Sequence, residues 1–467
     1  MLFDTPIYVV FLALTVLCYW CLPFRSQNKF LLLASYFFYG WWDWRFLCLM
    51  IASTVIDYFI AIKIEDTKEP KIRRSLLVLS LFINFSILGL FKYFNFFADS
   101  LAAALSTVGL AVSLPVLRII LPPGISFYTF QEVAYIVDVY SGKVRASRSF
   151  VDYGLFISLF PHLIAGPIQR PSHLLPQVQR ARRWSSQKAF DGLLLILEGV
   201  FRKCVIADNC ALIANAAFTG AFGRPSIPVV LLGMYAFAWQ IYGDFSGYSS
   251  IARGSAQLLG FHFMVNFRQP YLAESIQDFW RRWHISLSTW LRDYLYIPLG
   301  GNRKGEGATY RNLLLTMLLG GLWHGANWTF VIWGGIHGGS LAAERKVTEG
   351  KIPKPGAFRK WISRVFIFHL VGVSWIFFRA QSLRAAWQML RGFTAWSWRP
   401  EFPTAFLFLA VFSIPLLLID LHLESSGGEY CFESTPIRPR VAFGLACALA
   451  IAFLGANQAN AFIYFQF

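Results

Sequence analysis

The sequence predicts an all-α integral membrane protein, built as a polytopic bundle of helices. Of its 467 residues, 56% are hydrophobic and only 14% are charged, whereas a soluble domain carries about 25% charged residues. Apolar runs recur along the whole length, and no large polar block interrupts them. We therefore expect one membrane domain over residues 1–467, with about ten to twelve transmembrane or re-entrant helices. The apolar runs are continuous, which excludes an outer-membrane barrel of alternating strands.

The charge pattern is typical of membrane topology. The net charge of +17 comes from Lys and Arg residues that cluster between the hydrophobic segments, as the positive-inside rule predicts. Anionic lipid therefore accounts for the charge, and we expect no nucleic-acid partner. The seven cysteines are scattered and outline no disulfide framework. Cys18 and Cys21 have CxxC spacing but no second pair or histidine nearby, so we expect no metal site.

The first apolar segment is predicted to be a retained membrane span. No basic region precedes it and no small-residue cleavage site follows it. Arg25 and Lys29 come next, which places the N-terminus away from the cytoplasm. The charged residues 345–364 are expected to form a cytoplasmic loop. The predicted spans lie at about 7–22, 76–97, 189–217, 227–259, 365–378, 403–420 and 441–456, and a shorter amphipathic helix lies at 383–390.

Two proline-containing stretches interrupt the helical pattern. They are Pro122-Pro123-Gly124 and the stretch from Pro161 to Pro167. Broken backbone at membrane depth is tolerated only where protein or a water-filled cavity covers it. The chain is therefore expected to enclose a cavity, which suits a transporter, a channel or an enzyme. Asp244, in an otherwise apolar helix, is expected to be either a hydrogen-bond hub or part of a pore.

Residues 275–297 have apolar side chains at helical spacing along one face. We expect one helix in the plane of the interface, with its arginines at the cytoplasmic headgroups. On this pattern alone, His284 would be solvated or lipid-facing. The glycine-rich residues 300–305 are expected to form a plain turn, because no Ser or Thr follows Lys304 as a P-loop requires. The polar face of the segment carries Gln277, Arg281, His284, Ser288 and Arg292.

A histidine flanked by glycines marks the stretch Gly320-Gly321-Leu322-Trp323-His324-Gly325. It lies within the apolar residues 313–336, so His324 is expected near the middle of a membrane-spanning helix, where such a residue is costly and usually functional. The glycines are expected to leave room for a substrate to reach the imidazole. The alternative is a buried histidine hydrogen-bonded to a neighbouring helix.

Together these segments resemble the membrane-bound O-acyltransferase (MBOAT) family, in particular its bacterial alginate O-acetylation branch. The resemblance rests on Pro270-Tyr271-Leu272, on the run from Phe279 to Tyr294, on the run from Ile297 to Arg303, and on the glycine–histidine stretch. Residues 160–171 and 240–249 also look like family segments. In one departure, this chain has Ser250 where the branch tends to have Asp.

The resemblance implies a catalytic core over residues 270–340 and a tunnel near His324, the family's catalytic histidine. His284 matches a position that is Asn, Asp or His across the wider family. A neutral, buried imidazole can take the proton of an attacking hydroxyl. His284 is then expected to orient the thioester, to steady negative charge or to line the donor's entrance. The residues expected to line the tunnel or bind the donor are Trp323, Gly320, Gly321, Ser288 and Arg281.

The implied function is an O-acyltransferase of the bacterial cytoplasmic (inner) membrane. It would use acetyl-CoA as donor substrate, without a metal or prosthetic group, and act on a polysaccharide through an extracytoplasmic, SGNH-hydrolase-like partner. Residues 462–467 match an F-x-Y-x-x-F ending found in this branch, which implies that Tyr464 relays the acyl group. The simpler interpretation is that these aromatic residues anchor the chain at the membrane interface. The residues also leave open D-alanyl transfer to teichoic acid from a carrier protein, a structural scaffold, or a transporter, although the repeat symmetry expected of transporters is not seen.

Overall fold

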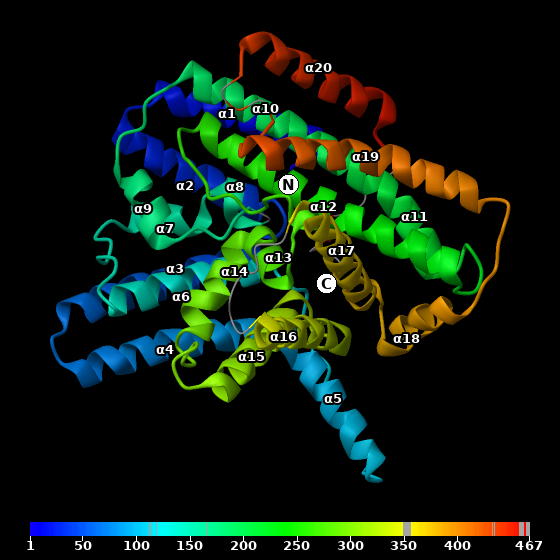
Figure 1. Ribbon diagram of the computed structural model, residues 1–467. Helices are drawn as coiled ribbons and strands as arrows, with labels where there is room; N and C mark the ends of the chain where they lie inside the picture. Colours follow the sequence, from blue (N-terminus) through cyan, green and yellow to red (C-terminus); the bar gives the residue numbers. More distant parts are fainter. Residues whose placement is uncertain are drawn as a thin grey trace. The chain divides into compact units, whose positions relative to one another are not determined.

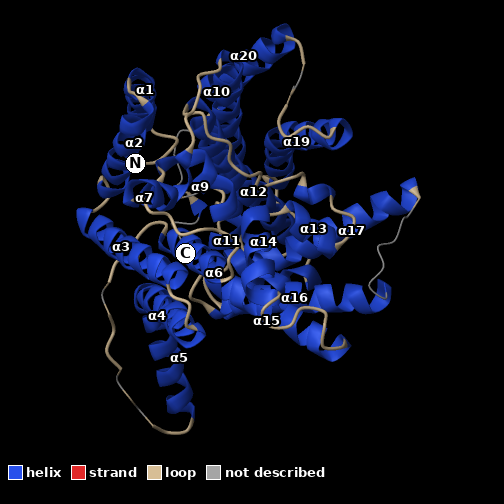
Figure 2. Ribbon diagram, turned by 90° about the vertical axis from the view of Figure 1, so that its left-hand side faces the viewer, coloured by secondary structure: helices blue, strands red, loops and turns tan. Residues whose placement is uncertain are grey.

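A computed structural model describes residues 1–110, 112, 114–117, 119–164, 166–348, 356–431, 433, 435–456 and 462–463. These residues form helices joined by turns and loops, without a strand among them (Figures 1 and 2). Within them, five helical stretches are long and apolar enough to cross a membrane. The predicted all-helical, polytopic membrane fold is confirmed. The five stretches are α3 (Trp44–Asp66), the run Pro70–Thr107, α17 (Ala357–Arg379), α19 (Phe402–Ser426) and α20 (Ile437–Leu454), and the shorter α1 (Pro6–Cys21) is also apolar.

The chain divides into two compact units. The first unit comprises Met1–Leu193 and Ala252–Met264, and the second comprises Leu194–Ile251 and Val265–Phe467. That residues 1–467 form a single membrane domain stays a prediction.

In the first unit, three helices pack side by side: α3, α4 (Pro70–Leu88) and α6 (Ile125–Tyr140) (Figure 1). Asp57 of α3 accepts hydrogen bonds from the Ser80 hydroxyl (2.5 Å) and the Asn84 amide (2.7 Å) of α4. Such pairing is what buried polar groups require away from water. This unit also contains α1, α2 (Phe24–Gly40), α5 (Phe94–Thr107), α7 (Phe150–Ser158), α8 (Phe160–Leu163) and α9 (Pro171–Gln179), with the π-helical turn η1 (Gly89–Tyr93) before α5.

The two predicted breaks in the helical pattern are present. Gly124, just before α6, has a φ of +74°, which a residue with a side chain rarely adopts. A Cβ at this position would lie 2.6 Å from the carbonyl oxygen of Leu163 at the end of α8. The two interruptions therefore touch each other through the backbone.

The second unit contains the segments that the sequence marks as functional. Its core pair is α15 (Glu306–His324) and α16 (Trp328–Thr348), against which α17 packs. The predicted short amphipathic helix is confirmed as α18 (Leu383–Arg391). The expected turn at 300–305 is also confirmed, with positive φ at its three glycines. The unit also contains the end of α10 (Ser186–Val200), the π-helical η2 (Phe201–Ala207), α11 (Asp208–Thr219), α12 (Ile227–Leu258) up to Ile251, α13 (Ile276–Arg282), α14 (Ile285–Leu291), the π-helical η4 (Arg292–Tyr296), α19 and α20.

The expectation of one continuous helix over residues 275–297 is wrong. The chain forms α13, breaks at Trp283 and His284, and then forms α14 and η4. His284 has φ 43° and ψ 54°, the left-handed conformation, which cannot continue a right-handed helix. Ser275 caps α13 by accepting a hydrogen bond from the backbone N–H of Asp278 at 3.0 Å. The polar face predicted from periodicity is therefore divided between two short helices.

The apolar residues 313–336 do not form one helix either. His324 is the last residue of α15, and α16 begins at Trp328. Between them, Asn327 caps α16, because its side-chain oxygen accepts the backbone N–H of Thr329 at 3.0 Å. The placement of His324 near the middle of a helix is therefore wrong. It lies at the tip of a helical hairpin.

Candidate active site

His284 is buried in the second unit, not solvated or lipid-facing as its helical face predicted. Its exposed fraction is 0%. The ring packs edge-on against Phe245, with 4.6 Å between ring centroids. Its Nδ1 lies 3.2 Å from Oδ1 of Asn266. Burial lowers the pKa of His284 to about 3, so the imidazole is neutral at physiological pH.

His324 lies close to His284 and is 3% exposed. The centroids of the two imidazole rings are 6.5 Å apart. Trp323, Trp333 and Phe378 surround His324 with ring-to-ring distances of 5.0, 5.2 and 5.3 Å. Because a ring nitrogen reaches about 3 Å to a hydrogen-bond partner, both imidazoles could contact one small reacting group in this aromatic enclosure.

The glycines beside His324 serve helix packing. A Cβ at Gly321 would lie 2.2 Å from the carbonyl oxygen of Phe330, and one at Gly325 would lie 2.2 Å from the Phe330 ring. The space beside these two glycines is thus filled by α16, which corrects the expectation of an open approach to the imidazole. Gly320 faces the other way, since its Cβ would meet the side chain of Leu291 on α14 at 3.1 Å.

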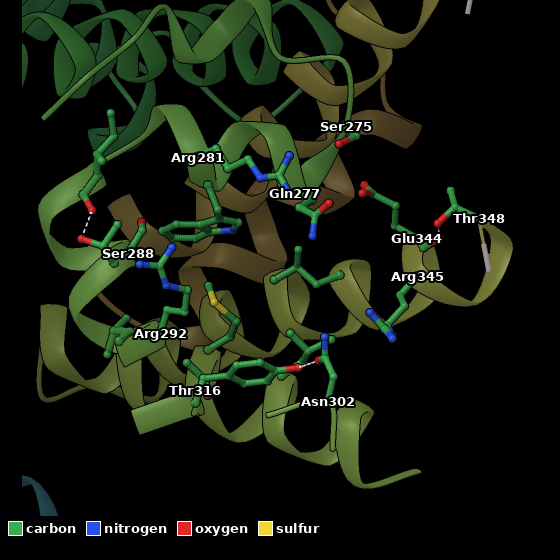
Figure 3. A pocket seen from close by; sticks show the side chains of 18 residues that line it. Ser275, Gln277, Arg281, Ser288, Arg292, Asn302, Thr316, Glu344, Arg345 and Thr348 are labelled. Atoms are coloured by element: carbon green, nitrogen blue, oxygen red, sulfur yellow. Dashed lines mark hydrogen bonds between the residues drawn. The ribbon is translucent and has the colours of Figure 1, made fainter. Parts of the chain in front are cut away.

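A cavity of about 460 Å³ lies between α13, α14, η4, α15 and α16 (Figure 3). Three arginines from separate elements line it: Arg281 of α13, Arg292 of η4 and Arg345 of α16. Figure 3 shows their side chains around the cavity together with uncharged hydrogen-bonding groups and one acid. The labelled polar residues are Ser275, Gln277, Ser288, Asn302, Thr316, Glu344 and Thr348.

The cavity and the histidine pair share a wall. Leu291 lines the cavity and also faces Gly320, one helical turn before His324. Trp280 lines the cavity too, and its ring lies 5.7 Å from that of Trp333, which in turn packs on His324. Along this route the rings of Trp280 and Trp333 separate the cavity from the imidazole of His324.

A third histidine lies behind this wall. His337 of α16 is 1% exposed, and its ring lies 5.1 Å from that of Trp280. The Ser374 hydroxyl donates to the carbonyl of Val371 at 2.7 Å, so the Nε2 of His337, 3.0 Å from that hydroxyl oxygen, must be the donor. Position 337 directly follows the apolar residues 313–336, and neither its burial nor its partner could be predicted from the sequence.

The structure brings together some predicted site residues and separates others. Arg281 and Ser288 line the cavity, whereas Trp323, Gly320 and Gly321 do not. Arg345 belongs to α16 and not to the loop predicted from its charge. Tyr464 lies outside the described residues. The roles of these residues, and of His284 and His324, stay predictions.

Asp244 is a hydrogen-bond hub, one of its two expected roles. Its carboxylate pairs with Lys203 of η2 at 3.1 Å and accepts the backbone N–H of Ile463 at 2.7 Å. Phe462, beside it, is 0% exposed and stacks on Tyr248 with 4.2 Å between centroids. Residues 462 and 463 are therefore anchored inside the second unit on α12.

Known proteins are similar in sequence to this chain over most of its length. The chain is 46% identical over 391 residues to a probable alginate O-acetylase of Azotobacter vinelandii, which covers 83% of this chain and 77% of that protein. It is 40% identical over 494 residues to a probable alginate O-acetylase of Pseudomonas putida, covering 100% of both. It is 38% identical over 424 residues to a peptidoglycan O-acetyltransferase of Helicobacter pylori, covering 84% and 79%.

A protein-family model also matches part of the chain. Residues 141–350 match the model described as MBOAT, membrane-bound O-acyltransferase family. That range contains His284, His324 and every residue that lines the cavity. The chain is thus a multi-pass membrane O-acyltransferase, and it belongs to the membrane-bound O-acyltransferase family.

Proposed function

We propose that this chain takes an acetyl group from acetyl-CoA on the cytoplasmic side of the bacterial inner membrane and passes it on for O-acetylation of an extracytoplasmic polysaccharide. The observation that carries the proposal is the arginine-lined cavity that shares a wall with the His284–His324 pair.

The cavity suits a phosphate-bearing thioester. Its volume of about 460 Å³ lies in the range of small-molecule sites. Guanidinium groups bind phosphate oxygens through paired, charge-assisted hydrogen bonds, so Arg281, Arg292 and Arg345 would hold the phosphates of CoA. Gln277 and Ser288 would pair with amides of the pantetheine arm. The thioester would then lie toward the shared wall and the imidazoles.

The reaction needs one proton transfer in each direction. The acceptor hydroxyl gives its proton to an imidazole while its oxygen attacks the thioester carbonyl. The carbon–sulfur bond then breaks, and the departing sulfur takes the proton back as a thiol. His284 and His324 are the groups in reach of this step. The buried, aromatic surroundings would keep bulk water from hydrolysing the thioester.

Delivery outside the cell requires an acceptor and a partner. The names of the relatives from Azotobacter vinelandii, Pseudomonas putida and Helicobacter pylori support a polymer as the final acceptor. We propose that Tyr464 is the first acceptor and that a separate SGNH-hydrolase-like transferase carries the acetyl group onward. The anchoring of Phe462 and Ile463 inside the second unit supports the relay, because it holds the chain one residue from Tyr464.

The test uses purified protein in nanodiscs with acetyl-CoA labelled in the acetyl group. Covalent label on the wild type that disappears in both His324→Ala and Tyr464→Phe would support the full route. Label retained in Tyr464→Phe but lost in His324→Ala would keep the enzyme and remove the relay. No label, even with the partner present, would overturn acetyl-CoA as donor and favour a carrier-protein thioester.

A further inference from the structure

The side-chain amide of Asn266 has a fixed orientation. Its Oδ1 lies 3.3 Å from the backbone nitrogen of Ser286 and 2.9 Å from the Ser286 hydroxyl. A backbone N–H can only donate, so the atom that faces it must be the oxygen. The Nδ2 of Asn266 points the other way and donates to the hydroxyl of Ser249 at 3.2 Å. Turning the amide over would set two donors against each other.

The main chain of Asn266 is held as well. Its carbonyl oxygen accepts the backbone N–H of Ile285 at 2.9 Å. Asn266 thus contacts the first two residues of α14, and it is 1% exposed. A side chain held at both its own amide atoms and its backbone has little freedom to rotate, so its oxygen is a stationary acceptor beside His284.

The fixed oxygen decides which nitrogen of His284 carries the hydrogen. Nδ1 of His284 is 3.2 Å from that oxygen, so Nδ1 must be the N–H donor. Burial keeps the ring neutral, because it lowers the pKa of His284 to about 3. A neutral imidazole has one N–H, and Nε2 therefore carries a lone pair.

We propose that Asn266 is a positioning residue that holds His284 as the Nδ1–H tautomer, so that Nε2 of His284 accepts the proton of the attacking hydroxyl. This inference rests on the proposed acyl transfer. The hydroxyl oxygen forms the bond to the thioester carbon as its proton moves to Nε2, and the sulfur leaves with that proton as a thiol. The same tautomer removes one of the expected roles of His284, the steadying of negative charge, since an oxyanion would need an N–H at Nε2.

The first experiment reads the tautomer directly and needs no activity. The full-length protein, labelled with ¹⁵N-histidine, would be placed in nanodiscs, and the signals of His284 identified by their loss in His284→Asn. The expected result is an N–H signal for Nδ1 and a lone-pair signal for Nε2. The opposite assignment would overturn the proposal, whether or not the protein proves to use acetyl-CoA.

The second experiment reads the pH profile of acetyl transfer. Asn266→Asp keeps an acceptor for Nδ1–H but adds a negative charge beside the ring, which raises the pKa of the imidazole. The acidic limb of the rate profile should therefore move to higher pH. Asn266→Ala removes the acceptor, and kcat should fall on the order of 100-fold, within the range that a positioned base contributes. His324 is the other imidazole whose ring faces His284, so the tautomer measurement is repeated in the His324→Gln protein, where Nδ1 of His284 should still carry the hydrogen.

Asn312 provides the matched control. It is also a buried asparagine of the second unit, 0% exposed, and its amide donates to the carbonyl of Gly301 at 3.1 Å. Asn312→Ala should lower the unfolding temperature without moving the acidic limb. If Asn266→Asp and Asn312→Ala leave the limb at the same pH, Asn266 is only structural and the proposal fails.

Discussion

Gly321 of α15 and Phe330 of α16 touch through their backbones. A Cβ on Gly321 would lie 2.2 Å from the Phe330 carbonyl oxygen, closer than real atoms approach. The same pattern recurs along the hairpin, where a Cβ on Gly334 would lie 2.2 Å from the carbonyl oxygen of Met317. His324 ends α15, three residues after the first contact. The close approach of the two helices therefore fixes the position of this imidazole.

Gly321→Ala is expected to destabilise the protein by roughly 3 kcal/mol, because a methyl group forces two backbones apart. Acyl transfer should be lost with it, since His324 moves. The comparison is Gly339→Ala on α16, where nothing lies within 4 Å of the added Cβ. That change should leave the unfolding temperature equal or slightly higher. Thermal unfolding in detergent checks both, and equal unfolding temperatures would contradict the packing role of Gly321.

Arg281→Gln and Arg345→Gln should each raise KM for acetyl-CoA by roughly 10- to 100-fold, since each removes a charge-assisted hydrogen bond to phosphate worth about 1.5–3 kcal/mol. kcat should change little. S-acetylpantetheine, a thioester without the nucleotide, provides the decisive comparison, because its KM should be the same for wild type and both variants. Arg384→Gln, on the exposed surface of α18, serves as the control variant. An equal effect on both donors would place the phosphates elsewhere.

The stability of the protein should depend on pH through His284. Burial lowers the pKa of its imidazole from 6.5 to about 3. Below pH 6.5 the unfolded chain therefore binds a proton that the folded chain does not, and stability falls as the pH falls. Between about pH 7.5 and about pH 5, the wild type should lose about 2 kcal/mol more than His284→Asn. Chemical unfolding at the two pH values checks this, and parallel losses would show that His284 is not buried neutral.

Asp244→Ala should cost roughly 2 kcal/mol or more, because Lys203 is 1% exposed and would lose a carboxylate partner, Asp244, while it keeps Asp208. The backbone N–H of Ile463 would lose its acceptor at the same time. We expect carboxypeptidase to release the C-terminal residues faster from this variant. The comparison is Asp208→Asn, which weakens the ion pair between Lys203 and Asp208. This variant should leave the rate at which carboxypeptidase releases the C-terminal residues unchanged. Equal release from both would remove the anchoring role of Asp244.

The sequence predicts the membrane class, several of the helices and part of the candidate site. Arg281 and Ser288 were found because the polar face of residues 275–297 keeps its helical spacing on both sides of the break. The break itself was missed, since a left-handed residue leaves no mark on a periodic pattern. Asn266 was missed as well. It lies between α12 and η3 (Pro270–Leu272), outside any helix, and only tertiary packing brings it to His284.

The glycines were misinterpreted for a related reason. A small residue beside a histidine has the same appearance in a sequence whether it opens a passage or admits a neighbouring helix. The carbonyl of Phe330, nine residues after Gly321, decides between the two. The charge of Arg345 was equally ambiguous, because it fits a cytoplasmic loop as well as a binding site. Arg345 lies on α16, where it lines the cavity, and does not begin a loop.

The backbone at His284 limits which residues can occupy that position, quite apart from any chemistry. Its φ of 43° is tolerated by glycine and, among residues with side chains, most readily by Asn, Asp and His. Those three are the residues that the family resemblance implies at this place. Two requirements therefore limit which residue can replace His284. The residue must tolerate the left-handed backbone conformation, and it must supply a polar group. A kinetic defect in a His284 variant therefore has two sources, because the same residue sets the angle between the helices that carry Arg281 and Ser288.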